Sequence, residues 1–397
     1  MPPNLKAPSP PASSMEDGPP PTTPVVASPP PRRYPQQTTQ PTTPPEPPPN
    51  RPQNPKTQSP IPPTDRTTTM PEKNWTQHIN QMAWGFKNSA ILLNAIRVGL
   101  FESLGHDWKT AAEVAADQGL NTRAVAIVLN ALTALEILRK EGDRFQTEEG
   151  ARALLLADSP HTLKSIMGHN LYMMRGWAQL EEVLRTGEPV PGRPRDERQM
   201  RDFILGMENI SRQSSRDVLA NLDLGRFRRL LDLGGGPATA AITFARAHAG
   251  LECVVFDLEG PIGIAIEQIT KAGLQDRIST VAGDFHTDEL PGGFDAVYIA
   301  NIIHMLDETA TLNLLRKARH ALRPGGRLLL KDFFVDETLT APVEAATFSV
   351  NMLVNTRGGK TYTREETHRL LREAGFRVEA EVDVAAISKV LEAGLSD

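Results

Sequence analysis

A glycine-rich segment is the first part of the sequence whose residue types could hold a ligand. It reads Leu-Asp-Leu-Gly-Gly-Gly-Pro over residues 231–237 and continues a short apolar run. Glycines let a backbone approach a ligand closely, and a proline suits the first turn of a helix. We therefore expect a strand, a ligand-binding turn and a helix that includes Pro237. The predicted ligand contacts come from Asp232, Gly234, Gly235 and Gly236.

Two acidic residues follow later apolar runs and could bind the polar groups of a nucleoside. Asp257 ends the next run, 21 residues beyond Gly236, and a carboxylate at that place accepts hydrogen bonds from ribose hydroxyls. Asp284 could accept a hydrogen bond from an adenine amino group, while the ring of Phe285 covers the base. Leu258, next to Asp257, is assigned to the same site.

The kind of ligand follows from what the glycine segment lacks. A dinucleotide site favours Gly-x-Gly-x-x-Gly, but Thr239 occupies the place of the last glycine. The segment also has no lysine or arginine that could clamp a phosphate. The sequence therefore predicts a cofactor without phosphates, S-adenosyl-L-methionine.

The residues around these motifs alternate between short apolar runs and amphipathic stretches, which is the pattern of a parallel sheet covered by helices. The last two strands are separated by a short turn only, which predicts a terminal antiparallel hairpin. We expect an α/β fold with a Rossmann-like methyltransferase sheet of seven strands in the C-terminal half. The predicted strands cover residues 230–233, 253–256, 278–281, 296–299, 327–330, 376–383 and 387–391, and the predicted helices cover residues 237–248, 260–272, 308–322, 342–355 and 364–375.

The residues before the sheet predict an α-helical domain of the winged-helix kind. Apolar residues recur at helical spacing over Trp75–Phe101 and Thr122–Leu135, and a Gly142-Asp143 turn joins two short strands. Such units often bind DNA, but the helix that would enter the groove carries one cation and a wide apolar surface, which favours contact with protein. Two longer helices are predicted at residues 162–185 and 196–221.

Side chains on two of the predicted helices are candidates for the wall of an acceptor pocket. Methionines and aromatic residues at helical spacing belong to a core more often than to a ligand site, but they can line either. The candidates are His169, Met173 and Trp177 on helix 162–185, with Phe348 and Met352 on helix 342–355.

The first residues differ in composition from the rest of the chain. Before Met70 lie 24 of the 34 prolines and few large apolar side chains, so this stretch cannot bury enough surface to fold. We divide the chain into a disordered proline-rich tail, residues 1–72, a helical dimerisation domain, residues 73–190, and a cofactor-binding methyltransferase domain, residues 191–397.

Composition also argues against several classes of protein. The formal net charge of −5 argues against nucleic-acid binding, because nucleic-acid phosphates are also negatively charged. We expect neither a signal peptide nor a membrane span, because no apolar run has the required length. The single cysteine, Cys253, fits a reducing, cytoplasmic location. The scattered histidines predict no metal site.

From about Trp75 to its end, the chain resembles the O-methyltransferases of the acetylserotonin (hydroxyindole) and caffeate type. The resemblance rests on the glycine segment, on Phe256-Asp257-Leu258, on Gly283-Asp284-Phe285 and on residues 358–376. It implies a homodimer made by the N-terminal helices, with catalysis on a small-molecule acceptor in the C-terminal half.

The same resemblance implies which residue removes a proton from the acceptor. In the family a histidine after the fourth strand is the general base, and it maps onto His304 in the segment that begins with Asn301, which we place at the cofactor. Of the two carboxylates that flank this base in the family, one maps onto Asp332 and the other onto Thr361, which is not an acid. The alternative for His304 is a structural role as the cap of the following helix.

Three functions therefore stay open. The first is methyl transfer to the hydroxyl of a small aromatic or enolic metabolite. The second is methylation of carbon, nitrogen or sulfur, or a use of the cofactor without methylation, which the missing carboxylate keeps open. The third is a winged-helix regulator with a degenerate methyltransferase half.

Overall fold

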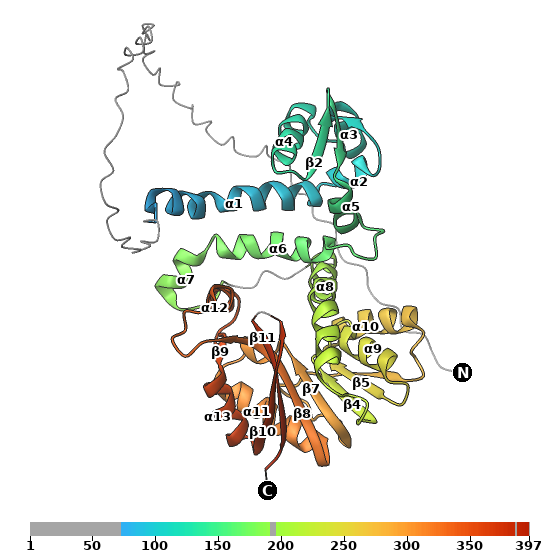
Figure 1. The fold of residues 1–397 in the computed structure, drawn as a ribbon, viewed down its shortest axis with the longest axis vertical. Helices are drawn as coiled ribbons and strands as arrows, with labels where there is room; N and C mark the ends of the chain where they lie inside the picture. Colours follow the sequence, from blue (N-terminus) through green and yellow to red (C-terminus); the bar gives the residue numbers. More distant parts are fainter. Residues whose placement is uncertain (1–72, 191–195, 386, 397) are drawn as a thin grey trace, which may run out of the picture. The chain divides into compact units, whose positions relative to one another are not determined.

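The computed structural model describes residues 73–190, 196–385 and 387–396 of the 397-residue chain. The predicted tail lies outside the described residues, and so does part of the loop at the predicted domain boundary. Helices come first in the described part, and alternating strands and helices follow (Figure 1). No helix in this part of the chain is both long and apolar enough to span a membrane.

The first helical stretch is two helices, where the apolar spacing predicts one. The helix α1 (Trp75–Arg97) is capped by Asn74, whose side chain accepts a hydrogen bond from Gln77 N. The helix α2 (Leu100–Leu104) begins after Gly99, which has a φ of 79°. Helical residues have negative φ, so this left-handed glycine ends the first helix and the prediction of a continuous one is wrong.

The winged unit forms as the sequence predicts. Thr110 and Glu113 make a capping box at the start of α3, and Asn121 caps α4. Buried side chains of these helices, among them Val114 and Leu129, share a core with the wing. The elements are β1 (Lys109–Thr110), α3 (Ala111–Gln118), α4 (Thr122–Ala134), β2 (Leu138–Glu141) and β3 (Arg144–Thr147).

Further helices lead from the wing to the large sheet. The prediction of one helix over residues 162–185 is wrong, because the chain turns at residues 178–179 and starts a second helix. The spacing also does not predict α5. Gly206 in α8 lets that helix approach α6 closely, since a Cβ there would lie 3.1 Å from Cα of Ile166. The helices are α5 (Glu149–Leu155), α6 (Lys164–Trp177), α7 (Leu180–Thr186) and α8 (Glu197–Asn221).

The C-terminal residues form the predicted sheet, with strand order β10-β11-β8-β7-β4-β5-β6. Strands β4 to β8 run parallel, whereas β11 is antiparallel to both β8 and β10. These strands and the terminal hairpin confirm the predicted fold class, and the short β9 pairs with β8 in addition. The strands are β4 (Arg229–Leu233), β5 (Glu252–Asp257), β6 (Ile278–Ala282), β7 (Phe294–Ala300), β8 (Leu322–Val335), β9 (Tyr362–Thr363), β10 (Phe376–Ala385) and β11 (Ser388–Leu395).

Helices cover both faces of this sheet (Figure 1), and each face has its own core. Leu231 and Val297 belong to the core with α11 and α13, while Leu230 and Tyr298 belong to the core with α8, α9 and α10. Two buried faces explain why the central stretches of the inner strands, such as Val254–Phe256 in β5 and Ala296–Ile299 in β7, are apolar without alternation. The helices are α9 (Thr239–Ala247), α10 (Glu259–Ala272), α11 (Glu308–Ala321), α12 (Val343–Asn355) and α13 (Arg364–Glu373).

The carboxyl ends of the parallel strands meet at one edge of the sheet. The register pairs Leu233 with both Phe256 and Ile299, and it pairs Asp257 with Ala282. The loops that follow these strands are therefore neighbours. The chain order reverses at β4, which pairs with β5 on one side and β7 on the other. Open α/β sheets bind ligands at such a switch point.

Candidate active site

The glycine segment forms a tight turn between β4 and α9. Gly234, Gly236 and Ala238 all have positive φ, at 70°, 52° and 62°. Because α9 begins only after Ala238, the prediction that Pro237 lies in its first turn is wrong. A Cβ on Gly234 would lie 2.5 Å from Cδ1 of Ile302, whereas one on Gly236 would meet nothing within 4 Å. Gly236 is therefore the place where a ligand could approach the backbone.

Asp257 holds this turn and keeps acceptor capacity for a ligand. Its Oδ2 accepts a hydrogen bond from Gly236 N at 2.8 Å, and its Oδ1 accepts one from Leu258 N at 2.7 Å. Each carboxylate oxygen has a second lone pair, so ribose hydroxyls could still donate to it. Burial raises the pKa of the Asp257 carboxyl, and the two backbone hydrogen bonds oppose this rise. The Leu258 side chain is exposed at the same edge.

Asp232 and Gly235 stabilise the turn by their packing and hydrogen bonding. The Asp232 carboxylate is buried, and its Oδ2 accepts a hydrogen bond from Ala241 N at 3.3 Å. A Cβ on Gly235 would come within 2.7 Å of this carboxyl group, which explains the glycine. Burial raises the pKa of Asp232 to about 7. The Asp232 carboxylate is thus turned toward α9 and supports the turn, and its contact with the cofactor stays a prediction.

Asp284 and Phe285 form a second loop beside Asp257. The two loops are joined by a hydrogen bond from Gly283 N to Asp257 O at 2.9 Å. Oδ1 of Asp284 accepts a hydrogen bond from His286 N at 2.8 Å, and the half-buried ring of Phe285 packs against the core. Lys317, which the sequence does not single out, donates to the backbone carbonyl of Phe285 at 2.9 Å and so holds the loop.

These groups fit the chemistry of S-adenosylmethionine. Asp257 and Asp284 are carboxylates that could accept hydrogen bonds from the ribose hydroxyls and the adenine amino group. Gly236 leaves the backbone open to a close approach. No lysine or arginine lies within residues 234–238, as suits a ligand without phosphates.

His304 lies in a short 3-10 turn after β7, at the same edge of the sheet. The N-cap of α11 is Asp307, whose Oδ1 accepts a hydrogen bond from Ala310 N at 2.8 Å, so His304 is not the cap of that helix. Its ring Nδ1 lies 2.6 Å from Oδ1 of Asp332. Both side chains are buried. Within the described residues, Nε2 of His304 has no hydrogen-bond partner.

Two phenylalanines surround the His304 ring. The Phe333 ring stacks with it at 5.7 Å between centroids, and the Phe348 ring meets it edge-on at 4.9 Å. The two phenyl rings lie 4.9 Å from each other. Phe348, a candidate for the acceptor pocket, thus contacts the histidine ring, and Phe333 is a second neighbour that the sequence does not indicate.

Thr361 is buried and its side chain is engaged by α12. Its Oγ1 donates a hydrogen bond to Ala345 O at 3.0 Å, and its backbone N donates to Ser349 Oγ at 2.9 Å. Among the described residues, Asp332 is the acid in contact with the His304 ring. No second carboxylate there replaces the one that the family resemblance implies at Thr361.

The remaining pocket candidates lie at different places. Trp177 Nε1 donates to Asn351 Oδ1 at 3.1 Å and so links α6 to α12, the helix of Phe348. His169 packs against the ring of Phe203 at 5.1 Å, which places it between α6 and α8. Met173 on α6 is half-buried, and Met352 on α12 is buried.

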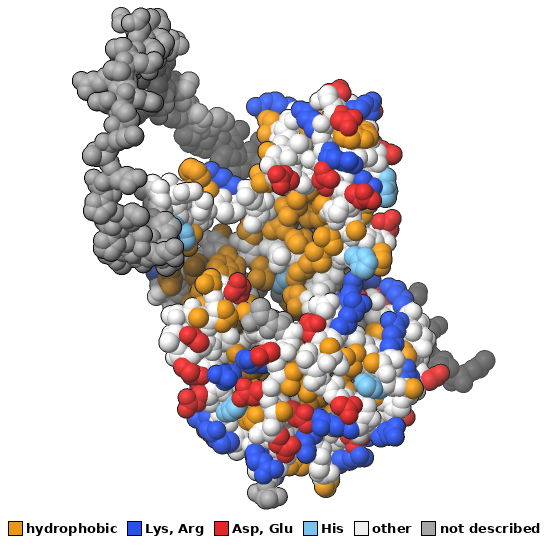
Figure 2. Space-filling view, in the orientation of Figure 1, with side chains coloured by type: hydrophobic (Ala, Val, Ile, Leu, Met, Phe, Trp, Pro, Cys, Tyr) orange, Lys and Arg blue, Asp and Glu red, His pale blue; other side chains and the backbone are white. Residues whose placement is uncertain are grey.

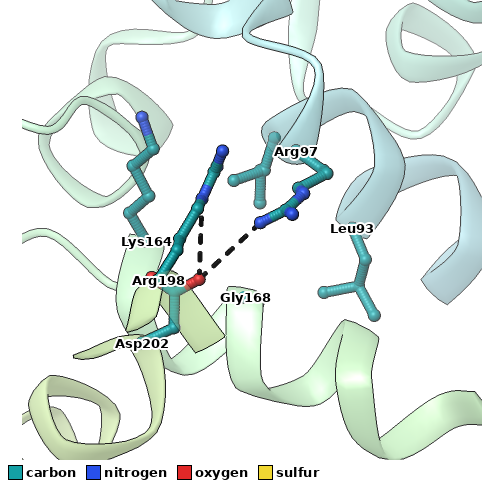
Figure 3. A pocket seen from close by; sticks show the side chains of 7 residues that line it. Leu93, Arg97, Lys164, Gly168, Arg198 and Asp202 are labelled. Carbon is teal, nitrogen blue, oxygen red and sulfur yellow. Dashed lines mark ion pairs between the residues drawn. The ribbon is translucent and has the colours of Figure 1, made fainter. Parts of the chain in front are cut away.

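A small pocket lies between α1, α6 and α8 (Figure 3), and one of its lining residues, Gly168, directly precedes His169. The Asp202 carboxylate lies 3.9 Å from the guanidinium groups of both Arg97 and Arg198. The rest of the wall consists of Leu93, Ile96, Lys164 and Gly168. The pocket encloses about 20 Å³, enough for one water molecule. It is too small for an acceptor. Among the described residues, no three His, Cys, Asp or Glu side chains are grouped as a metal site would require.

The fold and this set of residues define a class of enzyme, the Rossmann-like methyltransferases. Comparison with protein families matches residues 188–377 to an O-methyltransferase domain and residues 80–157 to an O-methyltransferase dimerisation domain. The chain belongs to this O-methyltransferase family, and it is a methyltransferase that depends on S-adenosylmethionine (SAM).

Individual proteins that the chain resembles are methyltransferases as well. The 3-hydroxy-5-methyl-1-naphthoate 3-O-methyltransferase of Streptomyces sahachiroi is 34% identical over 305 residues, which cover 75% of this chain and 88% of that protein. The L-tyrosine C(3)-methyltransferase of Streptomyces lavendulae is 31% identical over 313 residues, 75% of this chain and 84% of that protein. Human N-acetylserotonin methyltransferase in complex with SAM is similar in structure, with a TM-score of 0.73, 26% identity, and coverage of 83% of this chain and 100% of that chain.

Proposed function

We propose that the protein transfers the methyl group of SAM to the hydroxyl of a small aromatic acceptor, with His304 as the general base. The observation that carries the proposal is the 2.6 Å contact between His304 Nδ1 and Asp332 Oδ1. An ionised carboxylate can only accept a hydrogen bond, so Nδ1 carries the ring proton and Nε2 has a free lone pair. That lone pair is where a hydroxyl proton can go.

The reaction then needs one proton transfer by the protein. The acceptor oxygen forms a bond to the methyl carbon while its proton passes to Nε2 of His304. SAM supplies an electrophilic methyl carbon on a sulfonium that leaves as a neutral thioether. Proton uptake makes the imidazole cationic, and the buried Asp332 carboxylate stabilises that charge and keeps the ring oriented.

We assign the cofactor to the switch point of the sheet. Asp257 binds the ribose hydroxyls, and Asp284 and Phe285 bind the adenine. Gly236 provides the close approach to the backbone, and Asn301 borders the same site. Support comes from the register, which brings the loops after β4, β5, β6 and β7 together.

The rings around His304 support an aromatic acceptor. Phe333 and Phe348 pack against the imidazole and make its surroundings apolar and aromatic, which favours an aromatic ring as the acceptor. The names of two similar proteins describe aromatic acceptors, a hydroxylated naphthoate and N-acetylserotonin. We therefore propose a phenolic or naphtholic acceptor for this chain.

Transfer to a ring carbon is the second candidate. Two observations favour it: Thr361 stands where the family resemblance implies a second carboxylate, and one relative is named for methylation of a tyrosine ring carbon. An acceptor carbon of an ionised phenol needs less help from a base at the moment of transfer. The two candidates differ in their product.

The product distinguishes the candidates directly. The full chain is incubated with methyl-labelled SAM and a hydroxynaphthoate, and the product is examined by NMR. We expect a methoxy signal and a full set of aromatic protons. Loss of one aromatic proton would support carbon methylation and overturn the first candidate. Absence of transfer to a panel of phenols and naphthols would overturn the proposed acceptor class.

We also propose that the protein is a homodimer. Trp75, Ile79, Met82 and Phe86 recur at helical spacing on α1, and each is more than half exposed. Hydrophobic side chains gather across the middle of the face drawn in Figure 2, between the winged unit and the large sheet. A match to a dimerisation domain supports a second copy as the partner. The cytoplasmic location and the domain boundary near residue 190 are further predictions.

A further inference from the structure

β8 carries two charged residues in succession, and each contacts one residue of the segment after β7. Asp332 contacts His304, and Lys331 Nζ donates a hydrogen bond to Asn301 Oδ1 at 3.0 Å. Successive side chains of a strand point to opposite faces, so the two charged groups reach the segment from different sides. We propose that Lys331 is a positioning residue for the cofactor, which acts by orienting the carboxamide of Asn301. This inference rests on the proposed cofactor site.

The ammonium of Lys331 determines which way the Asn301 amide is turned. A lysine ammonium donates hydrogen bonds and accepts none, so the amide atom that it contacts must be the oxygen. The oxygen and the amino group of a planar carboxamide point in different directions, and a flip of the amide would exchange them. The ammonium prevents this exchange. Asn301 therefore presents its N–H donors on the side away from Lys331.

These donors lie beside the glycine turn. The register pairs Ile299 with Leu233, so Asn301 and Gly234 leave the ends of adjacent strands. Ile302, the next residue, has its Cδ1 2.5 Å from where a Cβ on Gly234 would be. Asn301 has a φ of 59°, which asparagine tolerates better than most residues. An N–H donor at this place suits the carboxylate of the amino-acid part of the cofactor.

A structural role alone explains Lys331 poorly, because burying an ammonium costs folding free energy. The side chain is 1% exposed, and burial lowers the pKa of Lys331 to about 8. Within the described residues, Asn301 Oδ1 is the one hydrogen-bond acceptor of the ammonium. The Phe333 ring lies 5.4 Å away, and the charges of Asp332 and Asp217 act on it without a hydrogen bond. A single hydrogen bond to a neutral amide does not repay the cost of taking an ammonium out of water.

Binding of S-adenosylhomocysteine to the full chain, measured by calorimetry, tests the inference. Lys331→Met removes the ammonium and releases the amide, and we expect about 5- to 10-fold weaker binding. Asn301→Asp keeps the contact with Lys331 but replaces the N–H donors by an oxygen. We expect it to weaken binding about 10-fold or more while Tm is preserved.

A double variant tests whether Lys331 acts through Asn301. In the Asn301→Ala background, Lys331→Met should change the affinity by less than about twofold, because the amide that it orients is already gone. Lys140→Met is the matched control. It removes a similar hydrogen bond, from Lys140 Nζ to Asn130 Oδ1 at 2.7 Å in the winged unit, and should leave the affinity unchanged.

Two results would overturn the positioning role while leaving the cofactor site intact. One is wild-type affinity in Asn301→Asp, and the other is full additivity of Lys331→Met with Asn301→Ala. A lower Tm in Lys331→Met, together with normal binding by Asn301→Asp, would assign Lys331 a structural role instead. Failure of the unmodified chain to bind S-adenosylhomocysteine would overturn the proposed cofactor site and this inference with it.

Discussion

Asp332 contacts His304 at two points, with Oδ1 2.6 Å from the ring Nδ1 and Oδ2 accepting a hydrogen bond from the backbone N at 3.3 Å. Phe333 N donates to the same Oδ1 at 2.8 Å. The carboxylate is therefore held by the backbone on both sides, and it fixes the tautomer and the orientation of the imidazole. The base is oriented by the fold itself, through residues 28 positions apart in the sequence.

Asp332→Asn should lower kcat by about 10- to 10³-fold and leave the affinity for S-adenosylhomocysteine unchanged. The amide removes the negative charge that stabilises the protonated ring, and it can hold the wrong tautomer. Steady-state rates at saturating cofactor and acceptor measure the effect. Asp336→Asn, an exposed acid four residues further along, is the control and should have a normal kcat. A normal kcat in Asp332→Asn would exclude its support of the base.

Thr361→Glu restores a carboxylate that the family resemblance implies, and the sequence alone predicts a gain of activity toward weakly acidic phenols. The structure predicts a loss of stability instead, because Thr361 is 2% exposed and its hydroxyl donates to Ala345 O. Burying a larger, charged side chain there should cost about 2–4 kcal/mol of unfolding free energy. Thr361→Val, which replaces the hydroxyl by a methyl group of similar size, should cost about 1 kcal/mol. Thermal unfolding of both variants distinguishes the gain of activity from the loss of stability. An undiminished Tm in Thr361→Glu would contradict the buried position of this residue.

The affinity for S-adenosylhomocysteine should fall on the acid side with the titration of Asp257. Burial raises the pKa of this carboxyl above its ordinary value of 3.8, so protonation begins at a higher pH and removes the acceptor of the ribose hydroxyls. The unfolded chain ionises more readily, so the contribution of Asp257 to stability decreases as pH rises between the two pKa values.

Calorimetry over roughly pH 4–7 measures how the affinity for S-adenosylhomocysteine changes with pH. Asp257→Asn should bind about 10- to 100-fold more weakly at neutral pH and lose this acid-side dependence. The same pH dependence in the wild type and in Asp257→Asn would remove Asp257 from the ribose site.

Ile79→Glu combined with Met82→Glu should convert the dimer to a monomer. Each exposed apolar side chain buried in an interface contributes about 1.5–3 kcal/mol, so the pair should weaken association by about 10² or more. Light scattering at micromolar concentration measures the mass. Asn88→Glu, on another side of α1 by helical periodicity, should leave the dimer intact. An unmodified chain that is monomeric would contradict the proposed assembly.

The sequence predicts those site residues that follow directly from strand ends. Asp257 and Asp284 come at or just after the ends of apolar runs, and parallel strands bring their carboxyl ends to one edge, so local spacing is enough. The role of His304 comes from the family resemblance and not from spacing. The break at Gly99 could not be predicted in this way, because a glycine inside an apolar helical pattern fits a continuous helix as well as a turn.

Contacts between residues that are distant in the sequence could not be predicted from it either. Lys331 and Asn301 are 30 positions apart, and Trp177 and Asn351 are 174 positions apart. Neither pair shares a strand or helix, and no periodicity relates them. These contacts form because packing places β8 beside β7 and α6 beside α12.

The rate of methyl transfer by His304→Ala tests the central claim most directly. The full chain and the variant are compared with methyl-labelled SAM and a hydroxynaphthoate, both at saturation, and binding of S-adenosylhomocysteine is measured in parallel. General-base catalysis is worth about 10²–10⁴-fold, so we expect kcat to fall by that factor while the affinity stays within about twofold of the wild type. A fall of less than about tenfold with normal binding would contradict His304 as the base.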